Sequence, residues 1–270
     1  MPPLRKPAVA GSFYPSDPKR LTQEMGRCLD FPPRPKKRAV GVVSPHAGSI
    51  YSGRVAGELY SQINIPDRLI LLSPNHTGYG VPFSIWPKGS WETPLGKAKV
   101  DEELAASFMN QCPLLEEDEE AHQTEHSIEV QIPFLQFLKK QFAFVPLTLS
   151  HVSYSDCVTV GHALAKTIRF SKKPVLIVAS SDMNHYENQK IAEEKDRLAI
   201  EQILRLDPKG LYETVHQKRI SMCGVIPTTV MLVAAQGLEA TKAELVRHAT
   251  SGEVTKDYGS VVGYASLIVS

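Results

Sequence analysis

No hydrophobic run in this chain approaches the length of a membrane-spanning helix, and no two cysteines have the C-x-x-C spacing. The basic N-terminal residues also lack the apolar stretch that follows them in a signal peptide. The four cysteines, Cys28, Cys112, Cys157 and Cys223, are far apart, which argues against a zinc ribbon or a dithiol redox motif. We therefore expect a cytoplasmic protein with reduced thiols and no membrane partner.

An excess of charge of one sign is also missing. The sequence has 30 basic and 29 acidic residues, which gives a formal net charge of +1. A nearly neutral protein has no overall field to attract a nucleic-acid backbone or an anionic lipid surface. We expect no nucleic-acid partner, so any ligand must be recognised by a local site.

The composition is that of an ordinary folded protein, with 42% hydrophobic and 22% charged residues. A chain of 270 residues is within the range of one large α/β domain. We predict a single domain over residues 1–270. Residues 1–38 should form an extended segment, a short helix from Pro18 to about Leu29 and a proline-rich connector, all packed on that domain.

From residue 39 onward, short apolar runs alternate with longer helical patterns. This order is typical of an α/β/α sandwich with a central, largely parallel or mixed sheet. The predicted strands cover residues 39–44, 69–73, 142–147, 175–180, 243–249 and 261–269. The predicted helices cover residues 53–62, 101–110, 127–140, 155–170, 190–205, 208–217 and 226–235.

Three of the predicted strands are followed by a histidine in polar, turn-forming sequence: His46, His76 and His185. The carboxyl ends of parallel strands lie at one edge of the sheet, where loops converge on a ligand. Histidine is the commonest metal ligand and the usual acid–base group. The sequence therefore predicts that these three side chains share one site.

Cys223 precedes a helix that we expect to begin near Ile226. A helix N-terminus favours the thiolate, the form of cysteine that binds metals. A free cysteine is also commonly a small buried apolar residue. The local sequence leaves both interpretations of Cys223 open.

Seven short motifs together resemble the Memo family. In sequence order, they are P-A-V-A-G-S-F-Y-P at 7–15, S-P-H-A-G at 44–48, S-P-N-H at 73–76, E-H-S-I-E at 125–129, S-S-D-M-N-H at 180–185, C-G at 223–224 and Y-G-S-V-V-G-Y-A at 258–265. The resemblance implies a fold like that of the class III extradiol ring-cleaving dioxygenases, with a non-haem metal site at one edge of the sheet.

The resemblance also implies roles for individual residues. His46, His76 and Cys223 match the metal-site positions of the family. Asp182 and His185 match its neighbouring active-site positions. Apart from the family, metal-site chemistry favours Asp182 as the group that orients a ring nitrogen and His185 as an acid or base, and the alternative is that both are plain turn and cap residues. Glu125 and His126 are expected at a helix start that faces the same crevice, with His126 in the pocket wall.

The ligand set bears on the metal. Two imidazoles and a carboxylate are typical of Fe(II) oxygenases, but here the third ligand would be the thiolate of Cys223. Because sulfur stabilises Cu(I), copper rivals iron as the cofactor, and ring cleavage is not expected. We expect one Fe(II) or Cu ion and a small-molecule or peptide ligand in the metal crevice.

A competing motif, H-x-x-E-H, is formed by His122, Glu125 and His126 and resembles the inverted zinc-protease signature. It requires a continuous helix through all five residues. Since Ser127 resembles a helix beginning, we predict that His122 lies in a loop.

Three hypotheses follow. The first is a metal-dependent redox protein with a small substrate, and the second is a non-catalytic module that recognises a peptide in the same crevice. The third is a zinc hydrolase that uses the H-x-x-E-H residues.

Overall fold

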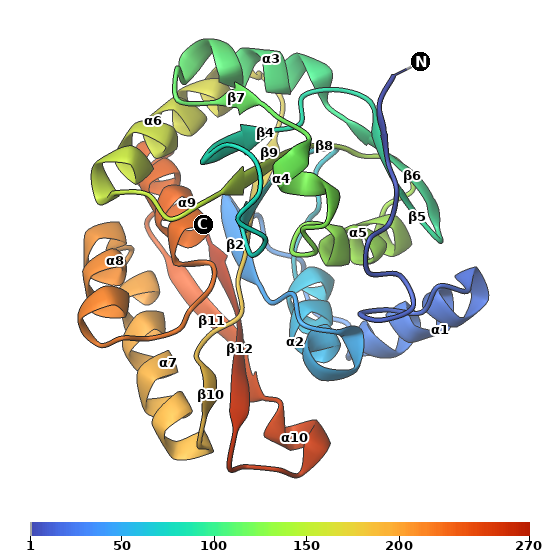
Figure 1. Cartoon of the computed structure of the whole chain (residues 1–270), viewed down its shortest axis with the longest axis vertical. Coiled ribbons are helices and arrows are strands. Elements are labelled where there is room, and N and C mark those ends of the chain that lie inside the picture. The colour runs from blue at the N-terminus through green and yellow to red at the C-terminus, as the bar shows by residue number, and fades with distance from the viewer. Residues whose placement is uncertain (1) are drawn as a thin grey trace.

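A large, mostly parallel sheet runs through the computed structural model, which describes residues 2–270 (Figure 1). Its centre has the order β8-β3-β9-β2, and these four strands are parallel. They are β2 (Gly41–Ser44), β3 (Arg68–Pro74), β8 (Ala143–Leu149) and β9 (Val175–Ser180). Antiparallel β12 (Val261–Val269) continues the sheet beyond β2 and pairs with β11 (Ala243–Thr250). The predicted fold class is confirmed.

All six predicted strands are present, but the sequence pattern missed six short ones. These are β1 (Leu4–Arg5), β4 (Phe83–Ile85), β5 (Ser90–Thr93), β6 (Gly96–Val100), β7 (Glu116–Glu117) and β10 (His185–Glu187). Each has two to five residues, too few for an alternating pattern to be recognised. They extend the sheet past β8 and, in β10, place His185 beside β12.

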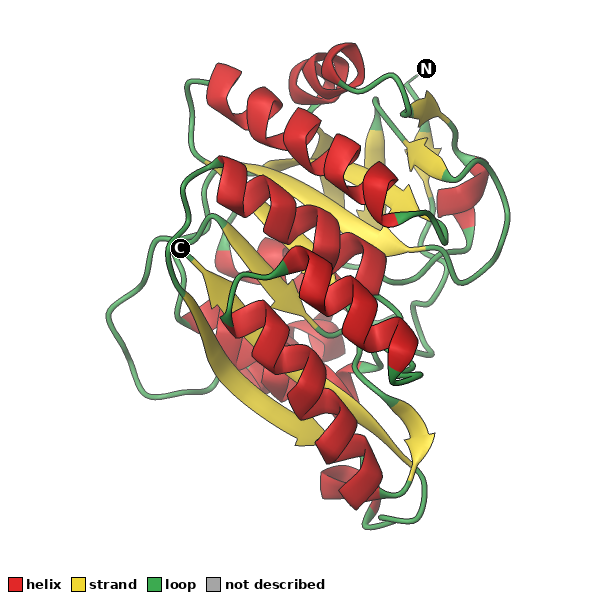
Figure 2. Ribbon diagram, turned by 90° about the vertical axis from the view of Figure 1, so that its left-hand side faces the viewer, coloured by secondary structure: helices red, strands yellow, loops and turns green. Residues whose placement is uncertain are grey.

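Helices cover both faces of the sheet. One face carries α3 (Glu102–Gln111), α6 (Tyr154–Phe170), α7 (Gln189–Leu204), α8 (Pro208–Gln217) and α9 (Val225–Gly237). The other carries α1 (Pro18–Cys28), α2 (Ser49–Ser61) and α5 (Ile132–Leu138). Figure 2 shows the first group crossing in front of the strands. Across residues 2–270, no helix is both long enough and apolar enough to cross a membrane.

The alternation of side chains along the strands divides the core into two layers. Val43, Ile70 and Leu72 belong to the layer under α6 and α9, whereas Val42 and Leu71 belong to the layer under α1 and α2. Successive residues of a strand point to opposite faces. Both faces of these strands are therefore buried, as expected for a parallel sheet covered by helices.

The predicted helix over residues 127–140 is wrong in its first third. A 3₁₀ turn, η1 (Glu129–Gln131), precedes α5, which begins only at Ile132 and has Pro133 in its first turn. Residues 124–128 form a bend and a turn instead of a helix. The cause is tertiary, because the buried Glu129 carboxylate binds groups far away in the sequence. The helix predicted from residue 53 also differs, since α2 begins at Ser49.

Glu129 anchors the N-terminal segment to the domain. Its carboxylate accepts hydrogen bonds from Arg5 Nη1 (2.6 Å) and the Tyr14 hydroxyl (2.6 Å). It also accepts from the amides of Ala8 (2.8 Å) and Val9 (3.0 Å). Neither Glu129 nor Arg5 is more than 2% exposed. A buried charge needs such partners to offset its loss of hydration.

Arg5 in turn holds the segment that precedes η1. Its Nε donates to the His122 carbonyl and its Nη2 to the Glu125 carbonyl, both at 2.7 Å. The guanidinium also lies 4.2 Å from the ring centre of Trp91, within range of a cation–π interaction. One arginine therefore connects β1, the neighbouring strand β5 and residues 122–129.

Replacing Glu129 by Gln is expected to lower the free energy of unfolding by about 3–5 kcal/mol, because it leaves the buried Arg5 cation without its counterion. Urea denaturation measures the loss. The matched control is Glu213→Gln, whose partner Lys209 is exposed and 3.7 Å away; it should cost less than about 1 kcal/mol. Equal losses in the two variants would contradict the anchoring role.

Candidate metal centre

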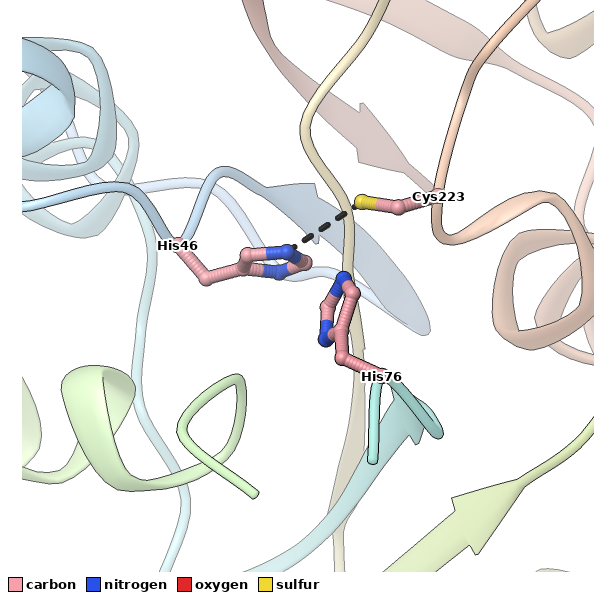
Figure 3. Close-up of side chains that lie close together, drawn as sticks. All are labelled: His46, His76 and Cys223. Atoms are coloured by element: carbon pink, nitrogen blue, oxygen red, sulfur yellow. Dashed lines mark hydrogen bonds between the residues drawn. The ribbon is translucent and has the colours of Figure 1, made fainter. Parts of the chain in front are cut away.

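The three predicted metal ligands, His46, His76 and Cys223, converge at the carboxyl edge of the central strands (Figure 3). His46 follows β2 by two residues, and His76 follows β3 by two residues. Cys223 comes from the far end of the chain, immediately before Gly224, the N-cap of α9. A side chain at position 224 would collide with Ser180 and Ser181, so glycine allows the chain to approach the end of β9 closely.

The three donor atoms are close enough to share one ion. The Nε2 atom of His46 is 3.2 Å from the Cys223 sulfur, and donor atoms of all three residues lie within 4.8 Å of one another. Nitrogen and sulfur ligands at about 2.0 and 2.3 Å from an ion lie roughly 3.0 to 3.5 Å apart for angles between about 90° and 109°. The donor set therefore fits a mononuclear transition-metal site with three protein ligands.

Glu125 orients His76. Its carboxylate accepts from the His76 backbone amide (2.6 Å) and lies 3.0 Å from His76 Nδ1. An ionised carboxylate only accepts, so Nδ1 carries a proton, and in the neutral ring Nε2 has the lone pair. The same carboxylate accepts from the amide (3.0 Å) and the hydroxyl of Ser127. This carboxylate–histidine pair is typical of the surroundings of metal ligands.

Asp182 acts on His46 differently from the prediction. Its Oδ1 atom accepts from the backbone amides of His46 (2.8 Å) and Ala47 (3.3 Å) rather than from a ring nitrogen. The His46 ring nitrogen Nδ1 instead lies 3.0 Å from the Ser180 hydroxyl. The Asp182 amide donates to the Cys223 sulfur at 3.2 Å. Asp182 therefore fixes the backbone of one predicted ligand and contacts the side chain of another.

The three imidazoles of the site differ in their affinity for protons. Burial, together with the neighbouring His126 and His76, lowers the pKa of His46 well below its usual value. Burial also lowers the pKa of His126, to about 4. Burial acts in the same direction on His76, but the hydrogen bond and charge of Glu125 outweigh it and raise the pKa. His46 and His126 are therefore neutral at physiological pH.

Cys223 does not have the lowered pKa expected beside a helix N-terminus. Burial and the Asp182 carboxylate raise the pKa of the thiol. Burial also raises the pKa of Asp182, to about 6. The first amide of the turn, that of Gly224, donates to the Ser181 hydroxyl (3.1 Å) and not to the sulfur. A buried thiolate beside a carboxylate requires a nearby cation, because both negative charges have lost their hydration.

A pocket of about 650 Å³ opens onto the three predicted ligands. It is lined on its apolar side by Phe13, Tyr51, Tyr186, Val262 and Tyr264, and on its polar side by Asp182, His126 and His185. The volume is within the usual range for small-molecule sites.

The two further histidines of the pocket are held in different ways. His185 Nδ1 lies 2.8 Å from the Ser221 carbonyl, which only accepts, so Nδ1 is protonated and Nε2 is the ring nitrogen left for a ligand. His126 is packed between the rings of His76 (4.8 Å between centroids) and Phe13 (4.6 Å). His126 and Glu125 lie in the loop between α4 (Glu120–Gln123) and η1, so the predicted helix start at these residues is wrong.

The residues of the H-x-x-E-H motif do not form a common site. His122 lies in the short helix α4, not in a loop as predicted, but that helix ends at Gln123. The His122 side chain is fully buried, with Nε2 3.2 Å from the Ser84 carbonyl and Nδ1 3.1 Å from the Thr148 hydroxyl. Both ring nitrogens are therefore engaged elsewhere, and the geometry does not support the zinc hydrolase.

A second group of donors, His76, Glu125 and His126, also lies within 4.8 Å. The Glu125 oxygens already accept from His76 and Ser127. Glu125 therefore serves as the outer partner of His76, and both of its oxygens are already engaged within the protein.

The sequence missed several residues that organise the site. Ser180 and Gln131 lie within hydrogen-bond reach of each other and of the His46 region. Ser180 ends a predicted strand and is the first residue of the S-S-D-M-N-H motif, so its position was a usable signal. Gln131 gave none, because it falls inside a stretch predicted as regular helix.

Acid should destabilise the protein partly through His122. Burial lowers its pKa to about 3, whereas an unfolded histidine has a pKa of about 6.5. Between these values the unfolded chain binds a proton that the folded chain does not, so stability falls as the pH falls. Each such group contributes up to about 1.4 kcal/mol per pH unit.

In the variant His122→Gln the unfolding free energy should therefore depend less steeply on pH between about pH 6.5 and 4.5. The reduction in slope should correspond to close to one proton fewer taken up on unfolding. Urea titrations at several pH values measure the slope. Above about pH 7.5 the two curves should run parallel, since neither state binds this proton there. If the difference in unfolding free energy between variant and wild type stayed constant below pH 6.5, the pKa of the buried His122 ring would not be lowered, and the prediction would be wrong.

Comparison with known proteins agrees with the fold and the motif pattern. Residues 5–268 match the family model described as Memo-like protein. The chain is 40% identical to a MEMO1 family protein of Methanothermobacter thermautotrophicus, over 98% of this chain and 99% of the relative. It is 41% identical to a MEMO1 family protein of Aquifex aeolicus, over 98% of each chain.

Among solved structures, an uncharacterized protein of Escherichia coli K12 superimposes with a TM-score of 0.57 over 84% of this chain and 98% of the other. At 15% identity this likeness concerns the fold alone. The family match and the relatives span nearly the whole chain. The chain therefore belongs to the Memo family.

Proposed function

We propose that this protein binds one iron or copper ion through His46, His76 and Cys223 and uses it in a redox reaction of a small molecule. The observation that carries the proposal is the convergence of two imidazoles and one thiol at the floor of an open pocket. Three protein ligands leave coordination positions for a substrate. When bound, such an ion would supply one-electron chemistry at those positions.

The donor chemistry favours these two metals. Imidazole suits iron and copper, and a thiolate adds a soft donor that stabilises Cu(I). Because Cys223 stands where an oxygenase of the facial-triad type has a carboxylate, ring cleavage is not proposed. The raised pKa of Cys223 fits a ligand whose proton is displaced when a metal binds, since a coordinated thiol is deprotonated.

The remaining pocket residues have distinct proposed roles. His185 presents the lone pair of Nε2, because Nδ1 donates to the Ser221 carbonyl. It is the proposed acid or base, able to hold a proton at Nε2 next to the bound molecule. Asp182 holds the backbone of His46 in place through its amide contacts. His126 forms a neutral wall of the pocket, since burial lowers its pKa.

One observation favours a second candidate, a module that captures a peptide without turnover. Tyr186 is 77% exposed and Tyr51 is 41% exposed, and both line the pocket. Exposed aromatic side chains at a pocket rim are typical of surfaces that bind another molecule. Redox activity of the metal-loaded protein distinguishes this candidate from the first.

Protein purified without chelators is expected to contain about one ion of iron or copper per chain, measured by mass spectrometry of the elements. Cys223→Ala should lower the affinity more than about tenfold by removing one of three ligands. His122→Ala and Cys157→Ala are matched controls, because both side chains are buried and belong to neither group of possible metal donors. Metal loss in His122→Ala but not in Cys223→Ala would overturn the proposed ligand set.

The metal-loaded protein, supplied with ascorbate as electron donor, is expected to consume oxygen faster than the same concentration of free metal. An oxygen electrode measures the rate. His185→Gln should slow the reaction roughly 100-fold while retaining the metal, if its nitrogen transfers a proton. Metal binding without any turnover in the wild type would favour the peptide-binding module instead.

A further inference from the structure

The hydroxyl of Ser180, the last residue of β9, is shared by three polar neighbours. It lies 2.7 Å from the Ser127 carbonyl, 2.8 Å from Gln131 Nε2 and 3.0 Å from His46 Nδ1. Ser180 is 1% exposed and Gln131 is fully buried. The hydrogen bonds at this position must therefore be satisfied within the protein.

The roles of the three neighbours can be assigned by counting. A serine hydroxyl has one hydrogen to donate and two lone pairs to accept with. The Ser127 carbonyl can only accept, so it takes the hydrogen. The Gln131 amide nitrogen can only donate, so it takes one lone pair. The remaining lone pair faces His46 Nδ1, which must therefore be the protonated ring nitrogen.

The orientation of the Gln131 amide, on which this count depends, is itself fixed. Its Nε2 also lies 2.9 Å from the Pro45 carbonyl, which only accepts, and its Oε1 accepts from the Tyr60 hydroxyl at 2.8 Å. Rotating the amide by half a turn would place its oxygen against the Pro45 carbonyl, two acceptors in contact. The hydrogen bonds therefore have one consistent set of directions: Tyr60 donates to Gln131, and Gln131 and His46 both donate to Ser180.

The opposite side of the ring agrees with this assignment. His46 Nε2 lies 3.2 Å from the Cys223 sulfur, and that sulfur already accepts from the Asp182 amide. In the absence of metal, the thiol hydrogen can point at Nε2 only if that nitrogen has a lone pair. The thiol can also donate to the Asp182 carbonyl at 3.6 Å, so this contact is compatible with the tautomer, and the Ser180 hydroxyl is the group that selects it.

We propose that Ser180 is a positioning residue that holds neutral His46 in the tautomer protonated at Nδ1, with the Nε2 lone pair directed at the metal position. The role of Ser180 in metal binding rests on the proposed metal site, but the tautomer of His46 is a property of the metal-free protein. A ring without this acceptor divides its population between two tautomers, and only one of them can bind a metal through Nε2.

The tautomer can be measured in chelator-treated, ¹⁵N-histidine-labelled protein by long-range ¹H–¹⁵N correlation spectra. The wild type should give a protonated Nδ1 and an unprotonated Nε2 for His46. Ser180→Ala should shift the ring toward the other tautomer, and Ser180→Thr, which keeps a hydroxyl, should restore the wild-type pattern. A wild-type ring protonated at Nε2, or a pattern unchanged in Ser180→Ala, would overturn the proposal.

Ser266→Ala is the matched control. Its hydroxyl is buried in β12 of the same sheet and has no hydrogen-bond partner among the described residues. Its removal should leave the His46 pattern unchanged. A change as large as that in Ser180→Ala would show that any loss of a buried hydroxyl disturbs the ring, which would also overturn the proposal.

Affinity for Cu⁺, measured by competition with a chromophoric chelator, separates this inference from the proposed function. Ser180→Ala should bind Cu⁺ about 10–100-fold more weakly than wild type, and Ser266→Ala should bind equally well. Wild-type protein that binds no metal, yet shows the tautomer and its response to Ser180→Ala, would refute the metal site and support the positioning role. Strong Cu⁺ binding that Ser180→Ala leaves unchanged would refute the positioning role alone.

Discussion

The buried ion pair between Arg5 and Glu129 determines the shape of the segment on which the site depends. Arg5 binds the carbonyls of His122 and Glu125, and Glu129 binds the amides and the hydroxyl of the N-terminal segment. Between these anchors the chain cannot continue as a helix, so Glu125 and His126 remain in an extended loop that faces His76. An interaction more than 120 residues apart in sequence thus sets the partners of a predicted metal ligand.

Desolvation governs the chemistry of the pocket. It lowers the pKa of His46 and His126 and raises that of Cys223 and Asp182, so each group is driven toward its neutral form. Glu125 and His76 are the exceptions, because their hydrogen bond and charge interaction outweigh burial, which lowers the pKa of Glu125 and raises that of His76. The result is a site with neutral imidazoles at His46 and His126 and a protonated thiol at Cys223. A metal cation is the charge that would reverse the preference of the thiol.

The sequence predicted what local patterns and strand ends determine. The six longer strands, and the meeting of His46, His76 and Cys223 at one edge, follow from buried runs that end in polar turns and from the family motifs. The turn at residues 127 and 128, where the sequence pattern predicts helix, could not be predicted, because helical periodicity is overridden there by contacts with distant residues. The contact of Asp182 with the backbone amide of His46 was also missed, since a sequence does not reveal whether a carboxylate will accept from a ring nitrogen or from a backbone amide.

The hydrogen bonds of the two carboxylates near the pocket explain why the third possible ligand is a thiol. The Glu125 oxygens accept hydrogen bonds from the amide and the ring of His76 and from Ser127. Asp182 holds the amides of His46 and Ala47, and it lies outside the group of donors that approach within 4.8 Å. Both carboxylates are therefore engaged by protein groups, and neither is free to complete a facial triad of two histidines and one acid. The thiol of Cys223 is the third donor that remains, and its softness shifts the proposed chemistry from oxygen insertion of the ring-cleaving kind toward copper or iron redox.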